Sequence, residues 1–217
     1  MNIALVASEV VPFSKSGGLG DVTAALARAL AARGHRVMTV SPAYRATSNL
    51  GAVDTGIHVD IPVGQAHQRI GFHRVHADGV DHLLVTHAMY DRDGLYGDKN
   101  GSFGDNHIRF ALLCRGALEA ARRVPLADGE PMGEDLVWHC HDWQTALLPV
   151  FLEATYRPLG LFPRAPTVLT IHNLAHQGRL PASFFLDLEL PSRWFAPWAL
   201  EFHGDLDMLK GGLLHAD

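Results

Sequence analysis

The chain has 217 residues, enough for one domain with a full hydrophobic core or at most two small domains. Hydrophobic residues make up 47% and charged residues 19%, which excludes a disordered chain. The formal net charge of −5 argues against a broad surface for nucleic acid or anionic membranes. Cys114 and Cys140 are predicted to be buried free thiols, and with no membrane-length apolar run the chain is expected to be cytoplasmic.

The first elements are predicted to form a βαβ unit over residues 2–41. Residues 3–7 are an unbroken apolar run, typical of a central parallel strand buried on both faces. After a glycine-bearing loop, apolar residues recur at helical spacing from Leu19, and Arg33-Gly34 has the composition of a helix end. A second strand follows over residues 35–41.

The middle of the chain is predicted to be a set of short, partly antiparallel strands or hairpins attached to the main sheet over 57–87, followed by a long loop over 88–105. The histidines in the strand region are scattered, and we expect most of them to be surface residues without a role. Loops of this length in a compact domain usually serve as lids or binding loops. A helix is predicted from Asn106 to Arg123, with one apolar face directed to the core.

The last part alternates strands and helices again. Strands are predicted over 136–141 and 167–171, with Asp142 as the N-cap of a helix over 143–156. The remainder is expected to be helical and irregular, ending in an apolar-periodic piece from Leu206 to Leu214. Alternating β and α segments predict an α/β fold, an open, mainly parallel sheet with helices on both faces. In such sheets ligands bind beyond the carboxyl ends of the strands, where the unusual polar residues of this chain cluster.

The first of these polar clusters is the segment from Lys15 to Val22 (KSGGLGDV). Gly17 and Gly18 stand directly before the helix, so a ligand can approach the backbone, and the first amides of a helix attract anions. Lys15 adds a mobile cation, and Asp21 is placed to cap the helix or bind a sugar hydroxyl. The glycine spacing matches neither a Walker A loop nor the dinucleotide fingerprint. A plain tight turn with a solvated lysine is the alternative.

Two further clusters follow later strands. Strand alternation places His139 and His141 on one face, which allows a zinc site, a core histidine satisfied by hydrogen bonds, or a polar strand end that serves a ligand. The segment from Thr170 to Gly178 (TIHNLAHQG) either presents His172 and Asn173 to a ligand or is a simple turn. A Ser-His-Asp hydrolase is disfavoured because no G-x-S-x-G elbow occurs.

Together these residues resemble the N-terminal domain of bacterial glycogen synthases and plant starch synthases. The matching segments span nearly the whole chain in the order of that family: 8–13, 15–22, 95–97, Asp105-Asn106, Arg109-Phe110, 141–144, 170–178, 209–212 and 215–217. Two positions depart from its pattern, since Ser16 stands where threonine is commoner and His176 replaces the usual tyrosine.

The resemblance implies a retaining transfer of glucose from ADP-glucose to the non-reducing end of an α-1,4-glucan such as glycogen, without a metal or cofactor. Lys15, Gly17 and Gly18 would face the diphosphate, with Lys15 alternatively on the acceptor side of the cleft. Asp21 and Asp142 would hold glucosyl hydroxyls, and His172 would lie against the transferred glucose. The remaining substrate-binding residues would be Tyr96 and Asn106 on the acceptor side, together with His141, Asn173 and Gln177.

In that family the chain continues into another strand and a second, nucleotide-binding domain of the two-domain GT-B fold. Residues 1–217 are therefore expected to be the Rossmann-like N-terminal domain, truncated before its last strand, and to be inactive alone. Two other hypotheses remain open: a non-catalytic glucan-binding half-domain, and a zinc hydrolase built on His139 and His141.

Overall fold

A computed structural model describes residues 1–45 and 51–217. Its main element is a seven-stranded sheet in the order β3-β4-β5-β2-β1-β8-β9. The five strands from β5 to β9 in this order run parallel, and only β3 and β4 are antiparallel to their neighbours. The predicted α/β fold with a mainly parallel sheet is confirmed.

The strands of the main sheet are β1 (Asn2–Val6), β2 (Arg36–Pro42), β3 (Val53–Val63), β4 (Ala66–Ala77), β5 (Val80–Thr86), β8 (Val137–His141) and β9 (Thr167–Thr170). The two strands predicted for the βαβ unit are therefore present as β1 and β2, and the two later predicted strands are β8 and β9. The antiparallel hairpins expected beside the main sheet are present as β3–β4 and β4–β5, which form one edge of the sheet, and their strands of 7 to 12 residues are longer than expected. Within this region, His82 is buried, an exception among histidines expected to lie mostly at the surface.

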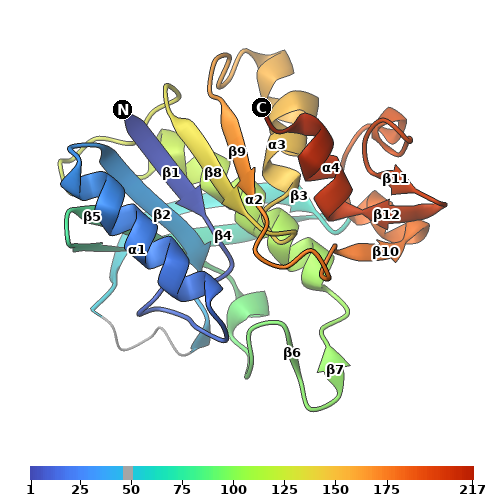
Figure 1. The fold of residues 1–217 in the computed structure, drawn as a ribbon, viewed down its shortest axis with the longest axis horizontal. Helices are drawn as coiled ribbons and strands as arrows, with labels where there is room; N and C mark the ends of the chain where they lie inside the picture. Colours follow the sequence, from blue (N-terminus) through green and yellow to red (C-terminus); the bar gives the residue numbers. More distant parts are fainter. Residues whose placement is uncertain (46–50) are drawn as a thin grey trace.

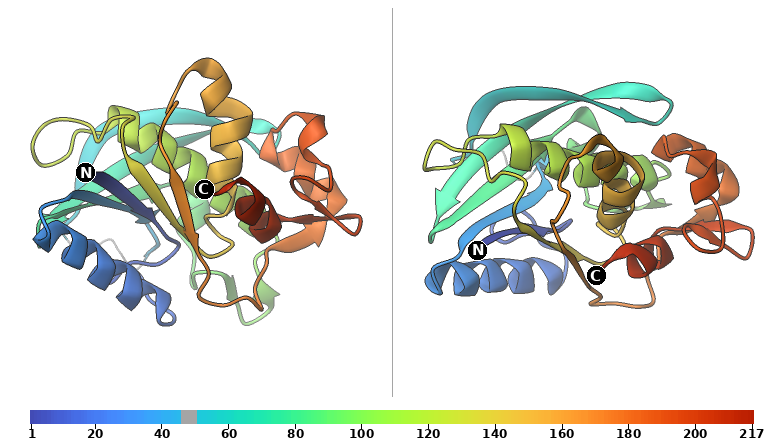
Figure 2. Two further views of the ribbon diagram at one scale, coloured as in Figure 1. Left: turned by 45° about the horizontal axis from the view of Figure 1, so that its top comes forward. Right: turned by 90° about the horizontal axis from the view of Figure 1, so that it is seen from above.

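Helices cover both faces of the sheet (Figure 2). The helix α1 (Leu19–Ala32) packs on the face that carries Ile3, Leu5 and Val37, whereas α2 (Asn106–Arg123) packs on the opposite face with Ala4 and Val6. The alternation along β1 thus sends successive side chains to different helices. Seen from above, the β3–β4 hairpin curves over α2 (Figure 2). This helix is therefore buried on nearly all sides, rather than on the single face predicted.

The predicted helix over 143–156 was wrong in its extent, and Asp142 is not its N-cap. The α-helix α3 covers only Leu147–Phe151 and continues as a π-helical turn, η3 (Leu152–Tyr156), and the short 3₁₀ helix η4 (Arg157–Leu159). Residues 142–146 form tight turns with bonds such as Thr145 N–H to the Asp142 carbonyl (3.2 Å). Pro149 lacks the N–H that would bond to Thr145 in a longer helix, which favours this arrangement.

The predicted long loop of residues 88–105 contains only one 3₁₀ turn, η2 (Ala88–Tyr90), and a minimal hairpin of β6 (Gly97–Asp98) and β7 (Gly101–Ser102). It lies at the lower edge in Figure 1, where the parallel strands end. The C-terminal part holds β10 (Arg179–Pro181), η5 (Ala182–Leu188), η6 (Ser192–Trp194), β11 (Glu201–Phe202), β12 (Asp205–Asp207) and α4 (Met208–His215). Its three-stranded sheet, β10-β12-β11, was not predicted, and Leu206 belongs to β12 rather than to the helix.

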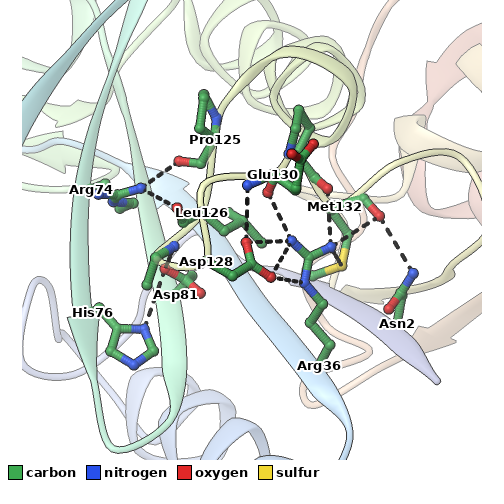
Figure 3. A network of polar contacts seen from close by, with 12 residues as sticks. Asn2, Arg36, Arg74, His76, Asp81, Pro125, Leu126, Asp128, Glu130 and Met132 are labelled. Carbon is green, nitrogen blue, oxygen red and sulfur yellow. Dashed lines mark hydrogen bonds and ion pairs between the residues drawn. The ribbon is translucent and has the colours of Figure 1, made fainter.

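A network of polar contacts fastens the connection between α2 and β8 to the amino-terminal edge of the sheet (Figure 3). Arg36 on β2 binds the Asp128 carboxylate through two nitrogens, at 2.9 and 2.8 Å, and donates to the Glu130 carbonyl at 2.7 Å. Arg74 on β4 donates to the Pro125 carbonyl at 2.6 Å. These contacts stabilise the edge opposite the polar clusters and leave the carboxyl edge for other loops. In the described residues, no helix combines the length and the apolar character needed to cross a membrane.

Candidate active site

The polar clusters that follow β1, β8 and β9 meet at the carboxyl edge of the sheet. They surround a cavity of about 640 Å³, which we call the central cavity. Seven of the eleven predicted site residues line it: Gly17, Gly18, Tyr96, Asn106, Asp142, His172 and Asn173. The chain order reverses between β1 and β8 in the sheet, and such a switch point is the usual ligand site of open α/β folds.

The four other predicted residues lie outside the central cavity. Lys15 and Asp21 form an ion pair at 2.7 Å with both side chains about half exposed, and Asp21 makes no cap bond to α1. His141 is fully buried behind His172. Gln177 lines a neighbouring cavity of about 710 Å³ that shares Asn106 and Trp143 with the central one.

Glu9 organises the glycine-bearing loop, a role that sequence reasoning missed. Its carboxylate is 2% exposed and accepts hydrogen bonds from the Ser16 hydroxyl at 2.7 Å, the Ser16 N–H at 2.5 Å and the Gly17 N–H at 3.4 Å. The Tyr96 hydroxyl donates to Glu9 Oε1, the oxygen that also accepts from the Ser16 hydroxyl, and lies 2.8 Å from the Ser8 hydroxyl. Glu9 therefore connects the loop after β1 to the 88–105 loop. The sequence signals were a carboxylate placed directly after a buried strand and its position in the 8–13 segment that matches the family.

Tyr96 and Asn106 hold the 88–105 loop in place. Burial is the main cause that raises the pKa of the Tyr96 hydroxyl far above its usual range, so this hydroxyl stays protonated and can donate to Glu9. The Asn106 side chain donates to the Tyr96 carbonyl at 2.8 Å and accepts from Arg109 at 2.6 Å. Arg109 is fully buried and also donates to the Leu95 carbonyl at 2.9 Å. Both Asn106 amide atoms are thus used to fasten the loop that forms one wall.

Asp142 organises the opposite wall. It has a left-handed backbone with φ +59°, a conformation that Asp and Asn tolerate better than most residues. This turn points its carboxylate at the segment after β9, where one oxygen accepts from the His172 N–H at 2.7 Å and the Asn173 N–H at 3.3 Å. The prediction of an N-cap therefore had the right chemistry, a carboxylate on free amides, but the wrong partner.

Three histidines stack from the sheet into the central cavity. The ring centroids of His139 and His141 are 4.3 Å apart and those of His141 and His172 are 5.2 Å apart. The predicted placement of His139 and His141 on one face is confirmed. Burial, followed by the charges of the two neighbouring histidines, lowers the pKa of His141 to about 3, so its ring is neutral at pH 7.

The proton of His141 can be placed from its contacts. Its Nδ1 lies 2.9 Å from His172 Nε2, while its buried Nε2 has no partner in the part of the chain that the structure describes. A buried N–H without a partner costs more than an under-used acceptor. We therefore assign the proton to Nδ1, which donates to His172 Nε2. A neutral His172 then carries its own proton on Nδ1.

The charges around the central cavity are unbalanced. Glu9 and Asp142 contribute two buried carboxylates, and neither lysine nor arginine lines the cavity within the described ranges 1–45 and 51–217. In those ranges no group of three or more His, Cys, Asp or Glu side chains is arranged to hold a metal ion. Cys114 and Cys140 are buried free thiols, as predicted.

Comparisons with known proteins agree on one family. A family model described as the starch synthase catalytic domain matches residues 2–217. The chain is 43% identical over 233 residues to starch synthase 1 of Arabidopsis thaliana, covering 100% of this chain and 36% of that protein. It is 39% identical over 220 residues to the glycogen synthase of Geotalea daltonii, covering 100% of this chain and 44% of the relative.

A solved structure shows the same fold. The catalytic domain of starch synthase IV from Arabidopsis thaliana, bound to ADP and acarbose, superposes with a TM-score of 0.82 at 25% identity. The match covers 99% of this chain and 43% of that chain. The sequence of 217 residues therefore spans less than half the length of the relatives that it matches.

Proposed function

This chain belongs to the starch synthase catalytic domain family, and on that premise we propose that it forms the N-terminal half of a GT-B glucosyltransferase. The reaction is transfer of glucose from ADP-glucose to the non-reducing end of an α-1,4-glucan, with retention and without a metal or cofactor. The observation that carries the proposal is the central cavity, where loops after β1, β8 and β9 are held by buried carboxylates. An adenine nucleotide is favoured because the starch synthase IV structure contains ADP.

The geometry suits the chemistry of a diphosphate leaving group. Gly17 and Gly18 open the start of α1, and the first N–H groups of a helix have no partner within the helix. Their partial positive charge stabilises the negative charge that develops on the departing phosphate. The Gly17 N–H already points at the Glu9 carboxylate, so we assign the phosphate to the amides of Gly18 and the first helical residues.

The other wall serves the glucosyl group. We propose that His172 lies against the transferred glucose, with its backbone carbonyl near the anomeric carbon, where positive charge develops in an oxocarbenium-like transition state. Asp142 fixes this carbonyl indirectly, because it binds the His172 N–H. His141 fixes the imidazole through its Nδ1–H. Asp142 is therefore a positioning residue that also lines the cavity, whereas His141, buried behind His172, acts in this proposal through positioning alone.

Lys15 and Asp21 were predicted to contact the substrate, but neither residue lines the central cavity. Lys15 and Asp21 form their ion pair on the surface, so a role at the diphosphate or a sugar hydroxyl requires this pair to open. The cations that neutralise the diphosphate come, in this proposal, from the second domain of the longer protein. A glucan acceptor would extend toward Gln177 through the neighbouring cavity. The buried free cysteines fit a cytoplasmic location, which we include in the proposal.

The test is glucosyl transfer by the full-length protein, measured with radiolabelled ADP-glucose and a maltooligosaccharide. Asp142→Asn is expected to lower kcat by roughly 100-fold or more, because a neutral amide holds the His172 N–H less firmly. His67→Gln, at an exposed position outside both cavities, is the matched control and should leave kcat unchanged. A full-length protein that retains glycogen but transfers nothing from ADP-glucose or UDP-glucose would refute the proposal in favour of a glucan-binding module.

A further inference from the structure

A separate pocket of about 790 Å³ lies at the carboxyl ends of β2 and β5. It is formed by the segment after β2, the outer face of the β3–β4 hairpin and the segment after β5, and we call it the basic pocket. Its lining residues are all different from those of the two cavities described above. Like the central cavity, it opens where parallel strands end, which is the side on which open α/β sheets bind ligands.

Basic side chains dominate this pocket although the whole chain is acidic. Arg45, Arg69, His58, His73 and His87 line it, and its only acidic lining residue in the described part of the chain is Asp91. A local concentration of this kind, within a chain of net charge −5, attracts anions to one place on the surface.

The two arginines differ in their surroundings. Arg45 donates to the Asp91 carboxylate at 2.8 Å and to that of Asp93 at 2.9 Å, so its charge is largely compensated. Arg69 is exposed and lies opposite Asp60 in the β3–β4 register, yet it forms no ion pair with any residue that the structure describes. Its guanidinium can therefore bind an incoming anion without breaking an existing pair.

A glycine shapes the floor of the pocket. A Cβ at Gly71 would lie 2.8 Å from Thr86 Oγ1 and 3.3 Å from His58 Nε2, so only glycine leaves this corner open without a shift. The opening brings a hydroxyl and an imidazole nitrogen beside the same piece of backbone. The hydroxyl can donate to a phosphate oxygen, and the imidazole nitrogen can do so when the ring is protonated.

The hydrogen bonds of His87 and His58 determine which ring nitrogen of each residue can donate to a ligand. His87 Nδ1 accepts from the Met89 N–H at 3.3 Å, so a neutral His87 carries its proton on Nε2, the free donor. His58 Nδ1 lies 3.3 Å from the Gly56 carbonyl and donates to it, because a carbonyl can only accept. Nε2 of His58 is then an acceptor when the ring is neutral and a donor when it is protonated.

We propose that the basic pocket binds a phosphorylated small molecule, with its phosphoryl group between Arg69, His58 and Thr86. A planar guanidinium, a hydroxyl and imidazoles together match the several oxygens of a phosphoryl group better than the two oxygens of a carboxylate. The volume of about 790 Å³ is much larger than a phosphate ion needs and falls in the range of pockets for organic ligands. The ligand class is therefore a phosphate monoester rather than inorganic phosphate alone.

Binding to the full-length protein is measured by isothermal titration with inorganic phosphate and, separately, with a hexose monophosphate. We expect saturable binding of both, tighter for the ester, and a loss of roughly tenfold or more in affinity in Arg69→Gln. Arg28→Gln removes an exposed arginine from α1, outside the pocket, and should bind like the parent protein. Tighter binding of inorganic phosphate than of the ester would show that the ester is not the ligand.

Further variants separate the basic pocket from the central cavity and from effects on folding. Thr86→Val keeps the side-chain shape but removes the hydroxyl, and it should weaken binding while the thermal midpoint changes little. An affinity that falls in Lys15→Gln but not in Arg69→Gln would place the anion beside the glycine-bearing loop before α1 and overturn the proposal. Absence of saturable binding of either ligand would also overturn it. None of these measurements needs glucosyl transfer, so they stand or fail independently of the proposed reaction.

Discussion

Replacing Glu9 tests whether buried carboxylates hold the walls of the central cavity. The Glu9 side chain receives the N–H groups of Ser16 and Gly17 on one oxygen and the hydroxyls of Ser16 and Tyr96 on the other. Glu9→Gln keeps one carbonyl oxygen for the two amides. Its new NH₂ group faces two hydroxyls, which can rotate and accept. Glu9→Ala removes every acceptor at once.

These differences set the expected magnitudes. A hydrogen bond to a charged group contributes about 1.5–3 kcal/mol, and a buried donor left unpaired costs about 1–3 kcal/mol. Contributions within one network do not add fully, so we expect Glu9→Ala to lower the free energy of unfolding by about 3–5 kcal/mol. For Glu9→Gln, which loses charge but keeps partners, we expect a loss of about 1–2 kcal/mol.

Hydrogen exchange gives a local measurement of the same effect. In Glu9→Ala, the Ser16 and Gly17 amides lose their acceptor and should exchange faster by roughly tenfold for each 1.4 kcal/mol of protection lost. The Val40 amide in the centre of β2 serves as the internal reference. Urea unfolding gives the global free energy. An alanine variant with unchanged stability and unchanged exchange at Ser16 and Gly17 would refute the idea that Glu9 holds this loop.

Two further predictions concern stability. Burial lowers the pKa of His82 to about 4 and that of His141 to about 3, so below pH 6.5 the unfolded chain gains protons that the folded chain does not. The contribution of these two neutral histidines to the free energy of unfolding is therefore complete above pH 6.5, and the free energy of unfolding should fall by several kcal/mol as the pH drops toward 4. Urea unfolding curves that give the same free energy across this pH range would contradict the prediction. In Gly212→Ala the new Cβ would lie 2.6 Å from the Ala146 Cβ, and we expect a loss of about 1–3 kcal/mol, whereas Gly104→Ala has open space and should melt like the parent.

The parallel strands could be predicted because their signals are local. Residues 3–7 are apolar on both faces, and β1 does lie at the centre of the five parallel strands with a helix packed on each face. The helix bounds of α2, from Asn106 to Arg123, were also predicted from spacing alone. The three-stranded sheet near the C-terminus could not be predicted in this way. Its strands have two or three residues each, too few to show alternation, and β10 pairs with β12 across a long connection.

The candidate site was predicted in its location but not in its contacts. The rule that ligands bind at the carboxyl ends of strands brought His172 and Asp142 together correctly. Residue spacing could not predict the backbone conformation of Asp142. Its positive φ turns the carboxylate toward His172, 30 residues later. Glu9 was included only as part of the 8–13 segment, and its bond to Tyr96 could not be predicted because that partner lies 87 residues away. Lys15 was expected at a ligand, and its pairing with Asp21 depends on side-chain directions that no spacing reveals.

Glu9 and Asp142 show how an edge made only of loops can be kept rigid. Each carboxylate follows one parallel strand and binds groups from a loop that follows another, so the loops after β1, β8 and β9 and the 88–105 loop are connected in two pairs. Charged acceptors suit this task because their bonds to amides are stronger than neutral ones. The consequence is a cavity wall with two carboxylates and, within the described residues, no lysine or arginine in its lining, so that backbone amides at the start of α1 are the anion-binding groups that this chain supplies in our proposal. In the proposed reaction, cations from a second domain would therefore have to offset these two carboxylates before a diphosphate could bind beside them.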